Sequence, residues 1–423
     1  ACLEFKGFVQ VQNWLDCWTV MNWTLLTGTF TASVLYLICV QFTSSVFGFQ
    51  FKPSSIRYFG KSSAIHTNHF KLDHLSVRTQ SNLQMSALVG KTYSVGIVGA
   101  TGAVGEEILG VLEKRNFPAS VVKLFASEKS AGKVVKSPVY GDLTLEAFSF
   151  EVASKLDVVL LAVGGDFSLE WGEKLTEAGV LVIDNSSAFR YHPNVPLVVP
   201  EINIQAAKGK KLIANPNCTT AIALMALWPI HKRFKIKKAI ISTYQAASGA
   251  GAPGMQELID GMAASVHKTP HTNKVFAHPL PYNVIPHIDV FQPNGYTKEE
   301  MKVAWESRKI MDAPDLKVSC TAVRIPTLRA HSEAITIETE EKITAEEVRQ
   351  ILSTAPGVKV VDDPANKLYP MPLTATQQWD VEVGRIREND VFDDRGLDLF
   401  VSGDQLLRGA ALNAVIIAEM MLA

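Results

Sequence analysis

The sequence predicts an α/β protein in which a doubly wound parallel sheet is combined with a second, α+β domain. Three observations support this prediction. The chain has 423 residues, well beyond the roughly 150 expected of one domain. From residue 93 an apolar run, a glycine-rich turn and a helical pattern follow one another. Near residue 218 the alternation of strands and helices changes to strand-rich segments.

The first predicted strand is Tyr93–Val98, and a helical pattern continues through Leu112. Between them lies the run Gly99-Ala100-Thr101-Gly102-Ala103-Val104-Gly105. Glycines there let the backbone approach a pyrophosphate at the positive end of the helix, as in Rossmann-type domains. Read as structure alone, the run would be a tight turn. The candidate dinucleotide contacts are Gly99, Thr101, Gly102, Ala103 and Val104.

Further strands are predicted at 121–126, 157–163 and 180–184, with a helix at 167–178. Alternation of strands and helices implies a parallel sheet with right-handed crossovers. This is the Rossmann-type, doubly wound part of the chain.

The segment after the second strand bears on which dinucleotide is used. Ser127 and Ser130, with two nearby lysines, stand where a ribose 2'-phosphate would lie, which favours NADP. Glu128 argues the other way, because an acid at this place usually binds the ribose hydroxyl of NAD. We predict NADP.

The second domain begins with a long apolar helix and continues with strands and helices in no regular alternation, which indicates an α+β arrangement. The expected helices are 219–234, 297–311 and 344–355, and the expected strands are 238–247, 317–325 and 332–339. The last segment, 405–422, is a strong helix that we expect to return to the first domain beside the cofactor.

Composition excludes several classes of protein. The formal net charge is −1, from 41 basic and 42 acidic side chains, so no electrostatic footprint for nucleic acid or an anionic membrane is present. Only Cys218 and Cys320 of the five cysteines lie in the globular part, which argues against a disulfide framework and against a cysteine-rich zinc site. No metal is predicted.

The first ninety residues differ from the rest. Residues 24–49 are apolar and uncharged, but their dense core at 34–40 is shorter than the roughly 20 residues of a membrane helix and fits a secretory signal. Residues 51–86 are basic and serine-rich, with Asp73 as their single acid, which is typical of a transit peptide.

The order of these two segments resembles the bipartite presequences of algae with secondary plastids. We therefore expect a targeting presequence over 1–90, signal-like at 21–48 and transit-like at 49–86, with translation starting at Met21 and delivery to a plastid. The alternative is a membrane anchor in the secretory pathway.

Cys218 is the leading candidate for catalysis. It lies between an extended run at 211–214 and the helix that starts near Thr219, so its sulfur should sit at a helix N-terminus, where positive partial charge favours the reactive thiolate. The side-chain amide of Asn217 and the backbone N–H of Cys218 could stabilise an oxyanion. A lone cysteine without these neighbours would be an inert core residue.

A second group of candidates lies further along the chain. His331, in a loop between two strands, can move protons near neutral pH, and Arg324 offers the forked donor geometry that suits a carboxylate. Glu299 and Lys302 share a helical face and could meet a zwitterionic ligand together. The alternative is that these are solvated loop and surface residues.

Four runs in order resemble the motifs of the aspartate-semialdehyde dehydrogenase family, over about residues 92 to 423. They are 99–105, 215–220, 245–251 and 324–333. The resemblance implies a homodimer or homotetramer with an NADP-binding domain at 91–217, completed by the helix at 405–423, and a catalytic and dimerisation domain at 218–404.

The resemblance also implies roles for individual residues. Cys218 would be the nucleophile, with Gln245 orienting the acyl intermediate and His331 acting as acid and base. Arg324 would hold the substrate carboxylate and Glu299 its amino group. The remaining roles are phosphate binding by Arg190 and Lys302, and nicotinamide contact by Gln405.

The implied reaction is reversible reductive dephosphorylation of β-aspartyl phosphate, through a cysteine thioester, to aspartate β-semialdehyde, in lysine, threonine and methionine biosynthesis. The partners would be a small-molecule substrate and phosphate, with no nucleic acid and, for the mature form, no membrane. Two alternatives are an N-acetylglutamyl-phosphate reductase and a nucleotide-binding regulator without catalysis, which would have no reason to keep Cys218, Gln245 and His331 together.

Overall fold

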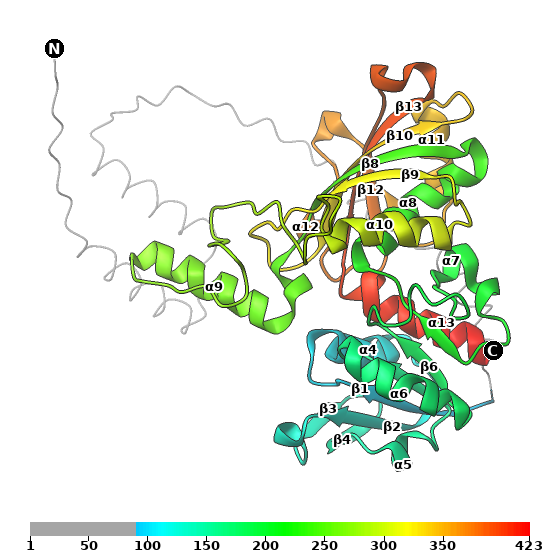
Figure 1. Cartoon of the computed structure of the whole chain (residues 1–423), viewed down its shortest axis with the longest axis vertical. Coiled ribbons are helices and arrows are strands. Elements are labelled where there is room, and N and C mark those ends of the chain that lie inside the picture. Colours follow the sequence, from blue (N-terminus) through cyan, green and yellow to red (C-terminus); the bar gives the residue numbers. More distant parts are fainter. Residues whose placement is uncertain (1–89) are drawn as a thin grey trace, which may run out of the picture. The chain divides into compact units, whose positions relative to one another are not determined.

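The computed structural model describes residues 90–423, which form two sheets with helices around them (Figure 1). The expected presequence lies outside the described residues. Within residues 90–423 no helix is long and apolar enough to cross a membrane.

The first sheet has seven strands in the order β3-β4-β2-β1-β5-β6-β7. All neighbours are parallel except β3 and β4, which form an antiparallel hairpin at the edge. The predicted Rossmann-type parallel sheet is therefore confirmed. The strands are β1 (Tyr93–Val98), β2 (Ala119–Ala126), β3 (Val134–Ser137), β4 (Gly141–Ala147), β5 (Val158–Leu161), β6 (Leu181–Asp184) and β7 (Leu212–Ala214).

Helices cover both faces of this sheet because its central strands are apolar on both sides. In β1, Val95 and Ile97 pack with α4 (Ala103–Lys114), whereas Val98 packs in the core on the α6 (Gly165–Glu177) side. The short α5 (Phe150–Ala153) also lies on the α6 side. The alternation follows from the two-residue period of a strand.

The end of the chain returns to this first sheet, as the red helix beside α4 in Figure 1 shows. A π-helical turn at Leu407–Ala411 leads into α13 (Leu412–Leu422), whose apolar side chains share a buried core with β1, β5 and β6. The sequence predicts one helix over 405–422, whereas the structure has this π-helical turn before the helix.

The second sheet has six strands in the order β11-β12-β13-β10-β8-β9, with both parallel and antiparallel neighbours. The predicted α+β domain is confirmed. The strands are β8 (Ile236–Tyr244), β9 (Lys317–Thr321), β10 (His331–Thr339), β11 (Val358–Val360), β12 (Val381–Glu388) and β13 (Gly396–Gly403).

One face of the second sheet is buried beneath helices. Figure 1 shows α8 (Cys218–Phe234), α10 (Lys298–Ile310) and α11 (Ala345–Ser353) on this side, while α9 (Gly251–His267) projects away. Two shorter helices, α7 (Pro200–Asn203) and α12 (Pro372–Ala375), lie in connections. Side chains of β8 alternate between the buried face and the opposite one, where Ile240 is 46% exposed.

Candidate active site

Cys218 is the first residue of α8 and follows the turn after β7. Asn217 caps the helix: its Oδ1 accepts the N–H groups of Thr219 and Thr220 at 3.1 and 3.2 Å. This cap leaves the backbone N–H of Cys218 as a first-turn donor that a ligand can use. The predicted position of the sulfur at a helix N-terminus is thus the observed one.

A cavity of about 310 Å³ opens around Cys218. Residues from helices and loops of both domains, and from the segment before α13, line it. Those predicted from the sequence are Val104, Arg190, Asn217, Cys218, Gln245, Glu299, Lys302, Arg324 and Gln405. His331 lies behind this wall. The other predicted dinucleotide contacts, Gly99, Thr101, Gly102, Ala103, Ser127 and Ser130, are absent from the cavity wall and lie after the ends of β1 and β2.

Glu299, on α10, connects the groups of the cavity. One carboxylate oxygen accepts from the amides of Asn217 at 2.9 Å and Gln245 at 3.2 Å, and the other binds the ammonium of Lys302 at 2.9 Å. Burial would raise the pKa of Glu299, but Lys302 and the amide donors lower it to about 2. Glu299 is therefore a fixed negative charge, only 6% exposed.

The helix N-terminus favours the thiolate of Cys218, but the surroundings of the thiol act in the other direction in the free site. Burial raises the pKa of Cys218 to about 11 and the carboxylate of Glu299 adds to the shift, while Arg190 and Lys302 oppose it. Local sequence does not show this balance, because the burial of the thiol and the approach of Glu299 are both set by the fold.

Asn217 has a further contact in the site. Its amide nitrogen, predicted as an oxyanion donor, gives one N–H to Glu299, and its oxygen is used in the cap. Its side chain therefore positions Cys218 and Glu299, while the second amide N–H and the backbone N–H of Cys218 remain as the predicted pair of oxyanion donors.

His331 and Arg324 meet at the wall formed by η3 (Ala247–Ala250). Nδ1 of His331 accepts the N–H of Ala246 at 3.0 Å, so the neutral ring carries its proton on Nε2, which is buried without a partner. Arg324 donates to the carbonyl of Ala246 at 2.7 Å. Burial, followed by the charge of Arg324, lowers the pKa of His331 to about 3, so the ring is neutral at physiological pH.

Gly249 explains why these two side chains can approach the cavity. A Cβ at Gly249 would lie 2.7 Å from Nη1 of Arg324 and 3.4 Å from the His331 ring. Any larger residue would push the guanidinium from its place.

Arg190 enters the site from the first domain and is 7% exposed. Its guanidinium donates to the carbonyls of Asn215 and Asn185, each at 2.8 Å, and to Glu306 at 3.2 Å. Lys302 likewise reaches Asp289 at 2.7 Å besides Glu299. Both cations predicted to bind phosphate are therefore held in place by the protein itself.

Gln405 joins three segments near the cavity. Its Oε1 accepts the N–H of Ala330 at 2.8 Å, and its amide donates to the hydroxyl of Ser248. The segment before α13 is thereby tied to the strand that carries His331.

Two further residues of this site were missed from the sequence. Glu306 is fully buried and accepts from the backbone N–H of Asn217 at 2.6 Å as well as from Arg190. Gly409 packs against the catalytic candidate: a Cβ there would lie 2.6 Å from that of Cys218. In the sequence, Glu306 is marked only by its position seven residues after Glu299 on the same helix. Gly409 is marked only as a glycine within a helical pattern.

The turn after β1 is shaped to receive a pyrophosphate. Gly99 has φ +86°, and a Cβ there would lie 2.3 Å from the carbonyl oxygen of Ala162. Gly102 caps α4 without a side-chain hydrogen bond, so the first-turn N–H groups remain for a ligand. These residues fit a dinucleotide. Among residues 90–423 no group of three or more His, Cys, Asp or Glu side chains could hold a metal ion.

The two halves of this arrangement match two parts of one protein family. Residues 94–210 match "Semialdehyde dehydrogenase, NAD binding domain" and residues 227–408 match "Semialdehyde dehydrogenase, dimerisation domain". Fold and sequence thus define the class: an NAD(P)-dependent semialdehyde dehydrogenase.

Comparison with individual proteins narrows the class. The chain is 48% identical over 337 residues to aspartate-semialdehyde dehydrogenase of Aquifex aeolicus, covering 78% of this chain and 98% of that protein. It is 45% identical over 329 residues to the Synechocystis protein of that name, covering 77% and 96%. The chain belongs to the aspartate-semialdehyde dehydrogenase family.

A solved structure agrees with this assignment. The crystal structure of aspartate semialdehyde dehydrogenase II from Vibrio cholerae, complexed with ASA, has a TM-score of 0.75 and 39% sequence identity. The match covers 79% of this chain and 99% of that one.

Proposed function

We propose that this protein catalyses the reversible, NADPH-dependent reductive dephosphorylation of β-aspartyl phosphate to aspartate β-semialdehyde, in the biosynthesis of lysine, threonine and methionine. The observation that supports it best is the charge layout around Cys218. A thiol at a helix N-terminus faces the fixed anion Glu299 and the cations Arg190, Lys302 and Arg324 in one cavity. An amino-acid substrate that also carries an acyl phosphate presents complementary groups to these charges.

Substrate recognition follows from these charges. Glu299 remains ionised because its pKa is about 2, so it can bind the substrate ammonium. Arg324 uses Nη1 on a backbone carbonyl and can offer the remaining guanidinium donors to the α-carboxylate. Arg190 and Lys302 supply the positive field for phosphate.

The raised pKa of Cys218 implies that the bound substrate promotes ionisation of the thiol. Since Glu299 raises that pKa, an ammonium bound at Glu299 offsets its effect, and Arg190 and Lys302 then act to lower the pKa. The thiolate attacks the acyl carbon, the carbon–oxygen bond to phosphate breaks, and a thioester remains on Cys218. The Cys218 backbone N–H, and Nε2–H of His331, are the donors for the oxygen of the attacked carbon.

The cofactor would be held by the turn at 99–105 at the start of α4, with Gln405 near the nicotinamide. When bound, NADPH supplies the hydride that reduces the acyl carbon. The preference for NADP over NAD rests on Ser127 and Ser130, at and beside the short helix η1 (Glu128–Ser130), against the exposed Glu128. Equal or higher kcat/KM with NAD would show that Glu128 determines the choice.

A coupled assay tests the reaction. The protein should reduce NADP with aspartate β-semialdehyde only when phosphate is present. Cys218→Ser should abolish turnover, because serine is a weak nucleophile at neutral pH. Cys320→Ser is the matched control: that cysteine is 3% exposed within β9 and should be dispensable. Turnover by Cys218→Ser, or turnover only with N-acetylglutamate semialdehyde, would overturn the proposal.

We further propose a homodimer that forms through the second domain. Large apolar side chains are exposed on α9 and in the segment between α9 and α10, among them Val266 at 67%, Tyr282 at 77% and Phe291 at 64%. Exposed apolar side chains that gather on one surface mark protein interfaces. The match of residues 227–408 to a dimerisation domain supports self-association through this part of the chain.

Delivery to a plastid remains our proposal for the first ninety residues. It rests on the order of the apolar run and the basic, serine-rich segment. A fluorescent fusion of residues 21–86 should reach the plastid, and deletion of 21–48 should leave it in the cytosol. Retention of the intact fusion in the endoplasmic reticulum membrane would favour the anchor instead.

A further inference from the structure

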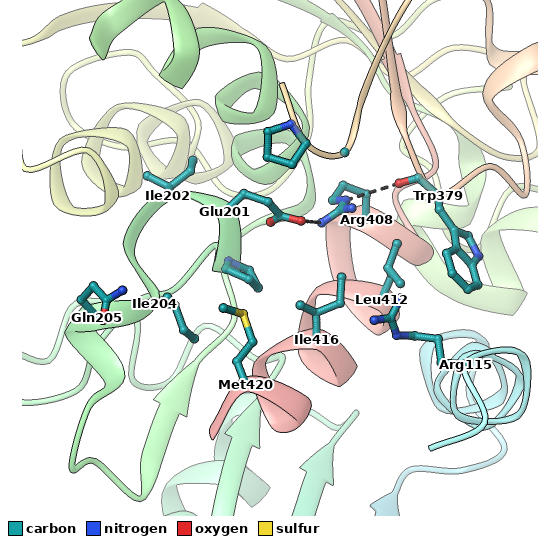
Figure 2. A pocket seen from close by; sticks show the side chains of 13 residues that line it. Arg115, Glu201, Ile202, Ile204, Gln205, Trp379, Arg408, Leu412, Ile416 and Met420 are labelled. Atoms are coloured by element: carbon teal, nitrogen blue, oxygen red, sulfur yellow. Dashed lines mark hydrogen bonds and ion pairs between the residues drawn. The ribbon is translucent and has the colours of Figure 1, made fainter. Parts of the chain in front are cut away.

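A second cavity, of about 270 Å³, lies beside α13 (Figure 2). It shares no lining residue with the catalytic cavity. Its wall comes from α4, the α7 region, the segment before β11, Trp379 and the C-terminal segment. Its volume is close to the lower limit for small-molecule sites, which begin near 300 Å³.

Two guanidinium groups form the polar part of this cavity. Arg408, only 2% exposed, donates through Nη1 to Glu201 at 2.6 Å and through Nε to the carbonyl of Trp379 (Figure 2). Arg115 binds Glu419 through two nitrogens at 2.7 and 2.6 Å and lies over the ring of Trp379. Both cations therefore already have carboxylate partners.

Glu201 has one acceptor left over. Its Oε1 binds Arg408, but its Oε2 is buried and has no hydrogen-bond partner. Burying a charged acceptor without a donor is costly, so the arrangement calls for an N–H or O–H group in the cavity. Apart from Gln205 and the two arginines, the rest of the wall is mostly apolar, with Ile204, Ile416 and Met420 among its residues (Figure 2).

The C-terminal segment separates the two cavities. Gln405, Leu406, Gly409 and Ala410 line the catalytic cavity, whereas Arg408, Leu412 and Ile416 line the second one. Gly409 is in close contact with Cys218, and Gln405 is bonded to the segment before His331. A displacement of this segment from one side must therefore change the wall of the other.

We propose that the second cavity is a regulatory site for a small amphipathic amine. The ammonium donates to Oε2 of Glu201, and an aliphatic or aromatic body packs against Ile204, Ile416 and Met420. Binding changes the packing of residues 405–411 and thereby alters the reactivity of Cys218. The proposal does not depend on which reaction the catalytic cavity performs.

Calorimetry with 2-phenylethylamine tests the binding. The amine should bind one site per chain, and its neutral isostere 2-phenylethanol should bind about tenfold more weakly or worse, because it lacks the charge-assisted hydrogen bond. Met420→Trp, which fills the cavity, should abolish binding. Ile204→Trp, which also places a large ring in the cavity, takes its place should Met420→Trp fail to fold. No binding to the unmodified protein would mean that water alone satisfies Glu201, and binding by both filled variants would place the amine elsewhere.

Alkylation of Cys218 by iodoacetamide tests the coupling without any enzyme assay. Saturating 2-phenylethylamine should change the rate by about fivefold or more, the lower end of typical allosteric coupling. In Met420→Trp the rate should not respond to the amine. Binding to the unmodified protein with an unchanged alkylation rate would refute the regulatory role, and displacement of the amine by phosphate would place it in the catalytic cavity.

Discussion

At Cys218 the helix N-terminus and the surrounding side chains act on different stages of the chemistry. In the proposed reaction, the free backbone N–H of the first turn would stabilise negative charge that develops on the acyl group. The resting thiol, by contrast, is governed by burial and by Glu299, which raise its pKa. Both effects disfavour the thiolate, which is the form that reacts with oxidants and alkylating reagents.

The first prediction is the pH dependence of that protection. Because the pKa of Cys218 is about 11, its thiolate fraction in the ligand-free protein rises about tenfold per pH unit below that value. The rate of carbamidomethylation should follow this rise through about pH 10. Mass spectrometry of the Cys218 peptide measures it site by site. A plateau below pH 9 would show that the thiol ionises much earlier.

The second prediction concerns Glu333, a buried residue outside the catalytic cavity. Both of its carboxylate oxygens lack partners and burial raises its pKa well above the usual value. Its folded form holds a proton that the unfolded chain releases near pH 4.5, so this residue costs the fold stability as pH rises above that value.

Replacement by the neutral isostere tests this assignment. Glu333→Gln should leave the free energy of unfolding almost unchanged at pH 4 and raise it increasingly towards pH 8. Denaturant unfolding at a series of pH values measures the difference. If the substitution raised the free energy of unfolding by the same amount at all pH values, the Glu333 carboxyl would not change its protonation on unfolding.

At the scale of elements, α10 holds the N-terminus of α8 in place. Glu306, on α10, binds the N–H of Asn217, the guanidinium of Arg190 and the hydroxyl of Tyr191. One buried carboxylate thus connects the catalytic turn to a cation from the first domain.

The third prediction follows from that connection. Glu306→Gln should lower the free energy of unfolding by about 3–5 kcal/mol, because it leaves Arg190 buried without its counter-charge. Catalytic activity should fall as well, because Asn217, which caps α8, loses the charged acceptor of its backbone N–H. Tyr191→Phe removes only the phenol hydrogen bond and should cost about 1 kcal/mol. Equal effects of the two substitutions would show that the charge of Glu306 is unimportant.

At the scale of the whole molecule, the second domain exposes the apolar side chains through which we propose that the protein dimerises. The fourth prediction is that Phe291→Asp, alone or with Tyr282→Asp, converts the dimer to a monomer. Leu373, 89% exposed on α12, provides a matched control, and Leu373→Asp should remain dimeric. Sedimentation velocity distinguishes the species. A dimer that tolerates both aspartates would place the interface elsewhere.

Much of this architecture could be predicted from the sequence, and the exceptions have physical reasons. β1, α6 and the start of α8 were predicted because short apolar runs and a helical period are local signals. Helix α9 was missed because its three glycines and one proline weaken the helical pattern. The expected strand at 238–247 ends earlier, at Tyr244, since Gln245 bridges to Arg324 instead.

The residues of the site can be divided in the same way, into those predicted from local sequence and those that depend on distant parts of the chain. Cys218 and Asn217 were predicted together because they are neighbours in sequence. The raised pKa of the thiol depends on burial and then on Glu299, and the close packing depends on Gly409, 191 positions further along. No pattern within a short stretch of sequence can reveal contacts between residues so far apart in the chain.

Residues 404–423 matter for how the protein is made. Before α13 has been synthesised, the core that it shares with β1, β5 and β6 lacks one of its walls, although α4 already packs against Val95 and Ile97. The nascent first domain therefore keeps part of its apolar core uncovered until this segment has left the ribosome, which makes it a substrate for chaperones. Because Gly409 and Ala410 line the catalytic cavity, a chain that stops before them lacks part of that cavity, and we expect it to be inactive and prone to aggregation.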